Sequence, residues 1–413
     1  MTPLVSSSLF HGWRVVAAAF IVAVFGWGFG FYGPPIYLHA VHEARGWTVA
    51  LVSAAVTTHF ICGALFVVAL PGLHARFGVP AVTIVGTAAL ALGVLGWALA
   101  PQPWQLFAAT VASGFGWAAT GAAAINAMVS PWFARRRPSA LAMAYNGASI
   151  GGIIFSPLWV TAIAALGFAR AAALLGAVMV LTVGLLARRY FSRTPAAMGL
   201  PVDGGDAMAK RSVDPRPRAM PLPGRGLWRN LRFQTLAIGT ALGLFAQIGL
   251  IAHLYSMLVP ALGQQGAGLA MGLSTCCALL GRMLLIWFLP SDRRIAVAAN
   301  YGLQVCGCAA FLLAGGGDVA LLIAGVVLFG SGIGNATSLP PLIAQSDFAE
   351  QDVSRTVALV LALSQATYAF APAAFGALRE FLTVGGAENT APFFVAAAII
   401  QLAAAATYLA GRR

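Results

Sequence analysis

Long apolar stretches recur along the whole chain and are separated by short polar or glycine-rich breaks. Each has roughly the 20 residues that an α-helix needs to cross a bilayer, whereas a barrel strand needs only about ten. Twelve such stretches can be delimited, at residues 15–38, 47–70, 81–99, 104–129, 139–165, 170–187, 233–258, 267–289, 295–314, 319–343, 356–382 and 391–410. This pattern predicts an all-α membrane protein with twelve transmembrane helices.

A polar break divides the twelve stretches into two sets of six. Residues 193–226 are rich in Pro, Gly and charge, so this segment cannot bury a core and is expected to be a flexible linker. Three motifs recur, each with one residue changed, at offsets between 215 and 219. They are SGFG at 113–116 and SGIG at 331–334, LPG at 70–72 and LPS at 289–291, and FSP at 155–157 and FAP at 370–372. Their order and nearly constant offset indicate a duplication. We therefore expect two pseudo-symmetric six-helix bundles, at 1–190 and 232–413, joined by a cytoplasmic linker at 191–231.

Composition supports a membrane location and gives an orientation. Hydrophobic residues make up 60% of the 413 residues and charged ones only 8%, against about 25% in soluble domains. The net charge of +13 would fit a nucleic-acid partner, but the basic residues gather in alternate loops, as the positive-inside rule requires. We therefore predict a multi-pass protein of the cell (inner) membrane with both termini in the cytoplasm. Its surroundings are the lipid bilayer, no nucleic acid binds it, and it is expected to be a monomer.

The segment WFARRRPSALAMAYNGASIG, Trp132–Gly151, resembles the sequence that enters the fifth helix of the monocarboxylate transporter family. The matching positions are Phe133, the basic run Arg135–Arg137 and the small residues that end in Gly147 and Gly151. The related oxalate/formate antiporters share much of this pattern. Arg135 and Arg136 are expected to serve topology and a gate between helices, and the two glycines to pack against a neighbouring helix.

The paired six-helix repeats resemble the major facilitator superfamily over essentially the whole chain. The resemblance implies a substrate site near the midplane between two halves that rock around it. The gating signature of that superfamily is typically Gly-x-x-x-Asp-Arg-x-Gly after the second helix. Here Pro71–Gly78 keeps Arg76 but has Ala75 in place of the acid, whereas the second-half copy, PSDRR, keeps Asp292 beside Arg293. Gating roles are therefore expected for these charged residues, with a solvated pair as the alternative for Asp292 and Arg293.

One arginine, Arg282, lies inside an apolar stretch. None of the eleven carboxylates lies well inside a stretch, and Asp292 is ten residues away. That separation is about 15 Å along a helix and places Arg282 near the middle of a hydrocarbon core of about 30 Å. A structural role, with the guanidinium bonded to helix carbonyls or water, is one interpretation.

The family resemblance implies the other interpretation. In monocarboxylate transporters and oxalate/formate antiporters, an arginine on the eighth helix binds the substrate carboxylate, and Arg282 matches it by helix and depth. A guanidinium is a planar fork that fits a carboxylate. Where the animal carriers have an acid one turn before this arginine, the chain has Ala278. The oxalate carriers add a lysine on the eleventh helix, and residues 356–382 contain none. The single fixed cation that remains favours a singly charged anion.

Further polar residues fall at a similar depth in other stretches. As substrate contacts we predict Asn126, Asn146, Asn335 and Gln365. Asn146 and Gln365 are favoured because the fifth and eleventh helices line the cavity in the fold that the chain resembles; helix–helix hydrogen bonds are the alternative for each. His59 is the proton-coupling candidate because histidine titrates near neutrality, with a packing role as the alternative. Tyr32 is expected to be an interface or packing aromatic, or else part of an extracellular gate.

These features predict a secondary active transporter that moves a small organic anion, expected to be a monocarboxylate, by alternating access with proton symport. The alternative is a proton-driven exporter of lipophilic drugs, although such pumps usually carry membrane carboxylates. An enzyme is not expected: no HExxH motif occurs, nor a Gly-x-Ser-x-Gly motif in its strand-to-helix context. The ATP-binding signature of primary pumps is also missing, and no metal or cofactor is implied.

Overall fold

The computed structural model describes residues 10–205, 224–288, 292–381, 383–384, 387–388 and 390–412. Parts of both predicted bundles and of the linker, and the repeated motif at 289–291, lie outside the described residues. The longer helices are α1 (His11–Gly30), α2 (Pro34–Arg45), α3 (Val49–Leu99), α4 (Pro103–Thr120), α5 (Ala122–Val129), α6 (Arg137–Leu166), α7 (Phe168–Leu186), α9 (Leu231–Phe288), α10 (Arg293–Ala314), α11 (Val319–Asp347), α12 (Glu350–Tyr368), α13 (Ala371–Phe381) and α14 (Ala391–Ala410).

Short elements complete the fold. They are the turns η1 (Ser130–Trp132), η2 (Ala187–Phe191), η3 (Ala196–Met198) and η4 (Val202–Gly205), the helix α8 (Gly224–Arg229), and the strands β1 (Thr383–Val384) and β2 (Ala387–Glu388). The two strands form an antiparallel hairpin. The described chain is therefore almost entirely helical, as the sequence predicts.

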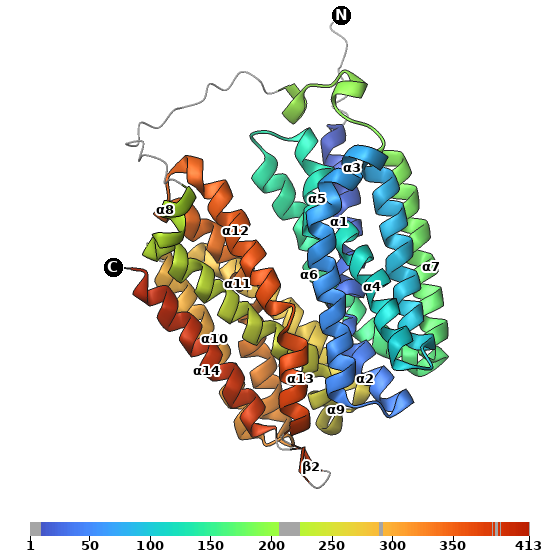
Figure 1. Cartoon of the computed structure of the whole chain (residues 1–413), viewed down its shortest axis with the longest axis vertical. Coiled ribbons are helices and arrows are strands. Elements are labelled where there is room, and N and C mark those ends of the chain that lie inside the picture. Colours follow the sequence, from blue (N-terminus) through green and yellow to red (C-terminus); the bar gives the residue numbers. More distant parts are fainter. Residues whose placement is uncertain are drawn as a thin grey trace, which may run out of the picture.

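Two helices are far too long for one membrane crossing. Within the described residues, ten helical segments are long and apolar enough to span a membrane. Of these, α3 has 51 residues and α9 has 58, about 75 Å or more if straight, against a hydrocarbon core of about 30 Å. Each is interrupted by one glycine with a positive φ, Gly78 at 79° and Gly263 at 67°, a conformation that glycine adopts without steric cost. Figure 1 shows α3 reversing direction at this break, and division at both glycines yields the twelve predicted segments.

The helices form two groups, shown side by side in Figure 1. The first half comprises α1 to α7 and the second half α9 to α14. The end of the molecule that carries Gly78, residues 130–136 and η4 is called the linker side here, and the end that carries Gly263 and the β1–β2 hairpin is the hairpin side. Contacts between the halves run from α6 and α2 to α9 and from α3 to α13. In Figure 1 these helices meet toward the hairpin side, and the halves diverge toward the linker side.

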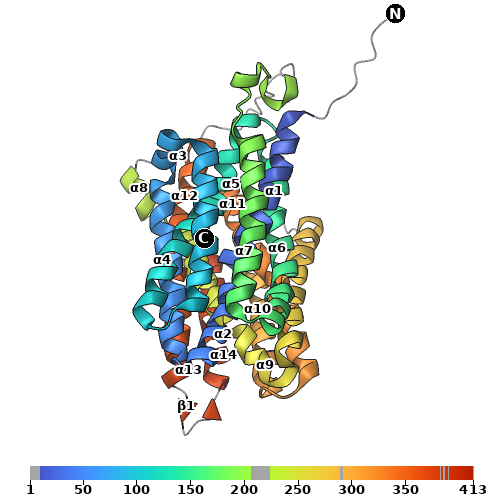
Figure 2. The ribbon, with the colours of Figure 1, turned by 90° about the vertical axis from the view of Figure 1, so that its right-hand side faces the viewer.

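Within the first half, α6 packs closely on α1. A Cβ at Gly147 would collide with the backbone carbonyl of Phe20, and one at Gly151 with that of Val24. Small residues let helix backbones approach in this way, so the predicted packing role of both glycines is confirmed. The Gly-x-Ser-x-Gly letters at 147–151 consequently lie in mid-helix, where Ser149 is buried. Figure 2, seen from the α7 side, shows α7 beside α1 and α3 in this half.

Candidate anion-binding site between the two halves

Arg282 lies in the second crossing of α9 and is partly buried. Its guanidinium rests against α11 at Gly334, where a Cβ would be 3.2 Å from Nε and from one terminal nitrogen. Gly334 therefore leaves the room that the guanidinium occupies. Nε is buried and has no hydrogen-bond partner. Across the residues that the structure describes, Arg282 makes neither a hydrogen bond nor an ion pair, so its fork of donors is unused.

A tyrosine of the first half lies close to Arg282. Tyr32 sits in the break between α1 and α2, is only 7% exposed, interacts with Thr275 and is within electrostatic range of Arg282. Thr275 and Tyr32 both crowd against Gly152 of α6, where a Cβ would be 2.6 and 2.7 Å from them. Thr275 and Arg282 are seven residues apart, so they share one face of α9. That face looks across the boundary between the halves.

Sequence reasoning missed Thr275 and assigned Tyr32 to packing or a gate. One signal was present: Gly33, Pro34 and Pro35 follow Tyr32 directly. Such a run ends a helix, and broken helices in transporters often face a central site. The structure indeed ends α1 at Gly30 and restarts the chain as α2 at Pro34.

The four predicted amide contacts divide into two kinds. Asn335 is buried, and its amide nitrogen donates to Asn300 of α10 at 3.0 Å and to the Ser331 carbonyl at 3.4 Å. Its Oδ1 has no partner. Asn126 is exposed on α5 and accepts a bond of 2.8 Å from the Ser130 hydroxyl. Asn335 thus makes the helix–helix bond that the sequence analysis gave as the alternative, whereas the bond of Asn126 is local, to the residue one turn further along the chain.

Asn146 and Gln365 have a different setting. Asn146 is exposed on α6, seven residues before Ile153, whose carbonyl lies 3.2 Å from a Cβ position at Gly272 of α9. Seven residues return to the same helix face, so Asn146 faces the second half on the linker side of this contact. Gln365 is partly buried on α12, one turn from Tyr368, whose ring meets Phe60 of the first half at 6.3 Å. Both amides are therefore on faces turned toward the opposite half.

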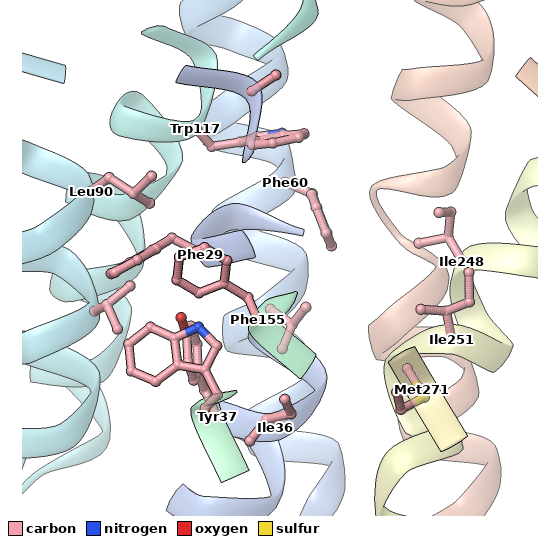
Figure 3. Close-up of a cluster of buried hydrophobic side chains, with 14 of the residues drawn as sticks. Phe29, Ile36, Tyr37, Phe60, Leu90, Trp117, Phe155, Ile248, Ile251 and Met271 are labelled. Atoms are coloured by element: carbon pink, nitrogen blue, oxygen red, sulfur yellow. The ribbon is translucent and has the colours of Figure 1, made fainter. Parts of the chain in front are cut away.

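An apolar cleft lies between the halves. It is lined by Phe31, Pro34, Pro35, Val56 and Phe60 of the first half and by Ile248, Ile251 and Ala252 of the second. Figure 3 shows Phe60 and, opposite it, Ile248 and Ile251 directed into the space between the two halves. None of these lining residues is charged.

His59 is enclosed within the first half. Its exposed fraction is 1%, Nε2 is 2.9 Å from the Gly30 carbonyl, and Nδ1 is 2.8 Å from the Ser113 hydroxyl. A carbonyl only accepts, so Nε2 carries the hydrogen and Ser113 donates to Nδ1 in the neutral ring. Both partners belong to the first half, and the arrangement links α1, α3 and α4.

Four of the expected gate residues make local contacts on the linker side. Arg76 lies over the ring of Phe77 at 5.0 Å. The backbone N–H groups of Arg135 and Arg136 donate to the carboxylate of Asp203 in η4, at 2.8 and 3.3 Å. Arg293 donates to the Leu342 carbonyl at 2.6 Å. The fifth gate residue, Asp292, caps α10 and forms an ion pair of 2.6 Å with Arg412, so its partner is not Arg293.

A second buried arginine, Arg294, has every part of its fork occupied. It is 4% exposed and pairs with Asp347 of α11 through Nε and Nη2, at 2.9 and 2.8 Å. It also donates to the Thr235 hydroxyl at 3.0 Å and to the carbonyls of Arg232 and Tyr408. Sequence reasoning counted Arg294 only as part of the basic flank. Its place two residues after the helix-capping Asp292 was the available signal.

Fold and site together define a multi-pass membrane transporter, not an enzyme. The model of the Major Facilitator Superfamily matches residues 16–372, and the chain belongs to this superfamily, whose members transport by alternating access. The chain is similar to monocarboxylate transporter 11 of Mus musculus, with 30% identity over 242 residues, which cover 56% of this chain and 48% of that protein. The chain thus spans about half the length of this relative.

Solved transporters share the fold. The nucleoside transporter NupG superimposes with a TM-score of 0.75 at 12% identity, covering 98% of this chain and 99% of that one. A bacterial homolog of the human lysosomal transporter Spinster, in an inward-facing and occupied conformation, gives 0.69 at 14% identity and covers 98% of each chain. At such identities the likeness concerns the fold alone.

Proposed function

We propose that this protein carries a small monocarboxylate, and that Arg282 binds the substrate's carboxylate. The observation that supports this most strongly is the unused guanidinium of Arg282, with a buried Nε that lacks a partner. A buried charge is costly unless it is paired, and an anion that arrives from outside would supply the pair. Similarity to a monocarboxylate transporter supports the same class of substrate.

A substrate carboxylate bound to Arg282 would bridge the two halves. Arg282 and Thr275 belong to the second half, whereas Tyr32 belongs to the first and lies near both. An anion on Arg282 can accept a second bond from the Tyr32 hydroxyl. Such a ligand binds more tightly to conformations in which both halves contact it. Alternating access requires this difference in affinity between conformations. Asn146 and Gln365 face the opposite half and are proposed to contact the rest of the substrate. Asn126 and Asn335 are proposed as further substrate contacts.

We propose that the protein lies in the inner membrane of the cell and that its linker side faces the cytoplasm. The basic residues Arg135–Arg137 and Arg188–Arg189 lie there, in accord with the positive-inside rule. The divergence of the halves in Figure 1 would then make this an inward-open conformation. In the opposite conformation, Arg76, Arg135, Arg136, Asp292 and Arg293 are proposed to close the inner side.

Proton symport is the proposed coupling. A proton that enters with the anion neutralises it and needs no relay beyond the site itself. His59 is retained as the titratable candidate, and its Ser113 partner can reverse its hydroxyl to accept from a protonated ring. The protein is proposed to act as a monomer.

One observation favours a second candidate, a proton-driven exporter of lipophilic compounds. The cleft between the halves is apolar on both walls, from Phe31 and Phe60 to Ile248 and Ile251. An apolar lining favours a lipophilic body over a charged one, and the space of about 10 Å³ between these walls would have to widen to admit it. The absence of a carboxylate from the middle of the described spans ranks this candidate second, because such exporters usually carry membrane carboxylates.

The test is uptake into proteoliposomes of labelled monocarboxylates, dicarboxylates and a lipophilic cation, with and without a pH gradient. Arg282→Ala is expected to lower kcat/KM for a monocarboxylate by about 10-fold to 100-fold, since hydrogen bonds to charged groups contribute about 1.5–3 kcal/mol. Arg170→Ala, at an exposed arginine of α7, serves as the matched control and should leave uptake unchanged. Wild-type affinity in a folded Arg282→Ala protein would contradict the proposal, and saturable transport of the cation would favour the exporter.

A further inference from the structure

On the hairpin side, α3 of the first half and α13 of the second form a polar seal. The Ala50 N–H donates to Glu380 at 3.1 Å, and the Ala373 N–H donates to the Thr57 hydroxyl at 2.9 Å. Between these bonds, Gly376 packs directly on Ser53. The residues are spaced as 50, 53 and 57 on one helix and 373, 376 and 380 on the other, so each set forms one helix face. An alternating-access transporter must part this seal to open the hairpin side.

A buried histidine of α9 lies directly behind the seal. His253 is 0% exposed, and its Cε1 lies 3.4 Å from a Cβ position at Gly376. Nε2 is 3.1 Å from the Pro372 carbonyl, and Nδ1 is 3.3 Å from Nη1 of Arg379, which also donates to the Ser256 hydroxyl at 2.7 Å. These three ring contacts, with Gly376, Pro372 and Arg379, all come from α13, the helix that carries half of the seal.

These partners fix the protonation state of the ring. The Pro372 carbonyl only accepts, so Nε2 carries a hydrogen; the guanidinium only donates, so Nδ1 is a bare acceptor. His253 is therefore neutral in the sealed conformation. A proton on Nδ1 would place two donors and two positive charges against each other in a fully buried site, and the contact with Arg379 would have to break.

We propose that His253 makes the seal pH-sensitive, so that acid on the hairpin side opens it by separating α13 from α9. The sign follows from linkage: the sealed conformation holds the neutral ring, so protonation favours the parted conformation, and the effect grows as pH falls. This inference uses the alternating access of the superfamily and extends the proposed function to its regulation, but it does not depend on which substrate is carried.

Other charged and titratable groups also surround His253. Among the described residues these are Arg379 and Glu380 on α13, and His39 and Glu43 on α2. The His39 ring meets Tyr255 at 5.3 Å and senses the charges of Glu43 and Arg379. From α14 the neighbour is Phe393, and from α3 it is Ser53, both uncharged. A cavity of about 310 Å³ on this side reaches α9 at Tyr255, two residues from His253, and is lined also by His39 and Glu43.

His59 provides the matched contrast. Its Nδ1 faces the Ser113 hydroxyl, which can either donate or accept, so a protonated His59 ring keeps both of its bonds. Only at His253 does protonation oppose a partner that is permanently a donor.

The experiment measures the distance between the halves without any substrate. Spin labels are placed at exposed positions on the hairpin side, Trp104→Cys on α4 and Phe381→Cys on α13, after replacement of the five native cysteines. Pulsed electron resonance on protein in lipid nanodiscs is expected to show a longer distance gaining population from about pH 8 to about pH 5.5, by at most about tenfold per pH unit because a single proton is linked. A distance distribution that does not change with pH would overturn the proposal.

Three variants assign the response. His253→Gln can donate to Pro372 and accept from Arg379 but cannot become charged, so it is expected to remain sealed at both pH values. His11→Gln, at the start of α1 on the linker side, where the ring packs on Trp132, is expected to keep the full response. If His253→Gln fails to fold, Arg379→Gln gives the same answer, because its amide oxygen accepts from a protonated ring and the pH step should vanish. Persistence of the step in His253→Gln or Arg379→Gln would refute the proposal. A protein that transports no monocarboxylate would leave this measurement unaffected and would count only against the proposed function.

Discussion

Two arginines of the second half, Arg282 and Arg294, lie twelve residues apart and have opposite surroundings. On the linker side, Arg294 pairs with Asp347 and donates to a hydroxyl and two carbonyls. In the second crossing of α9, Arg282 lies against the glycine backbone of α11, and its Nε is buried without a partner. All donors of the Arg294 guanidinium are bound within the chain, whereas the Arg282 guanidinium has donors without a partner among the described residues.

The difference separates a structural arginine from one kept for a ligand. Arg294 joins α10 to α9, α11 and α14, so the fold itself uses the charge. Arg282 joins nothing in the described structure, yet its side chain is held between Gly334 and the boundary of the two halves. The cost of a charge at this depth makes sense if a carboxylate compensates it during part of the transport cycle.

The largest expected effect concerns the saturated arginine. Asp347→Ala would leave Arg294 buried without its charge partner, and breaking such a pair typically costs about 3–5 kcal/mol. We expect a lower thermal transition, measured by tryptophan fluorescence in detergent, and a smaller yield of monodisperse protein. Asp318→Ala removes a carboxylate that only caps α11 and is the control, with a loss of about 1 kcal/mol. Equal stability of the two variants would remove the structural half of the comparison.

The unused arginine should behave in the opposite way. Arg282→Met removes a charge that has no partner, so the stability of the free protein should stay the same or rise by about 1 kcal/mol. Stabilisation by ligand should disappear: a bound monocarboxylate at 100 times its Kd adds about 2.7 kcal/mol to the parent and nothing to the variant. Thermal unfolding with and without the anion measures both quantities. A marked loss of stability in the unliganded variant would show that Arg282 is structural too.

The sequence was sufficient for one part of this comparison and insufficient for the other. Apolar periodicity predicted the helices, and the absence of acids from the spans singled out Arg282, because both depend on residues counted along the chain. The saturation of Arg294 depends on Thr235, Asp347 and the Tyr408 carbonyl, which come together only when four helices pack. The same holds for Tyr32, since its neighbours Gly152 and Thr275 lie far away in sequence.

Gate assignments were limited for the same physical reason. Motif spacing placed Asp292 beside Arg293, but the structure pairs Asp292 with Arg412, which is 120 residues further along the chain. A loop motif identifies which charges lie at a helix end, whereas the partner of each charge is decided by tertiary packing.

A partner for Arg282 can also be introduced. Ala278 is one turn before Arg282 on α9 and is buried, and residues four apart are neighbours on a helix. Ala278→Asp would give the guanidinium an internal carboxylate that competes with the substrate. We expect uptake to fall at both about pH 7.5 and about pH 5.5, because a carboxylate beside a guanidinium has a pKa below its ordinary value of about 3.9 and stays charged at both. Ala278→Asn, which is of similar size but uncharged, should lower uptake much less, and equal losses in the two variants would count against an anion-binding Arg282.

The smallest effect concerns a third group of donors, the backbone N–H groups of residues 134–136. These donors bind a carboxylate of the chain itself. The carboxylate of Asp203 accepts the backbone N–H groups of Ala134, Arg135 and Arg136, and this docks η4 on the loop before α6. Burial raises the pKa of Asp203, but these three donors outweigh it and hold the pKa below its ordinary value.

Because the folded pKa of Asp203 is lowered, docking is fully favoured above the ordinary carboxyl pKa of about 3.9 and weakens only as pH falls through the lowered value. Asp203→Asn should therefore resemble acid treatment of the parent, with faster amide hydrogen exchange at residues 134–136 and no change in anion uptake near neutral pH. Asp206→Asn, three residues further along the chain, is the control. Loss of uptake in Asp203→Asn would mean that this docked loop belongs to the transport machinery, and that the distinction between filled and unfilled donors extends beyond the two arginines.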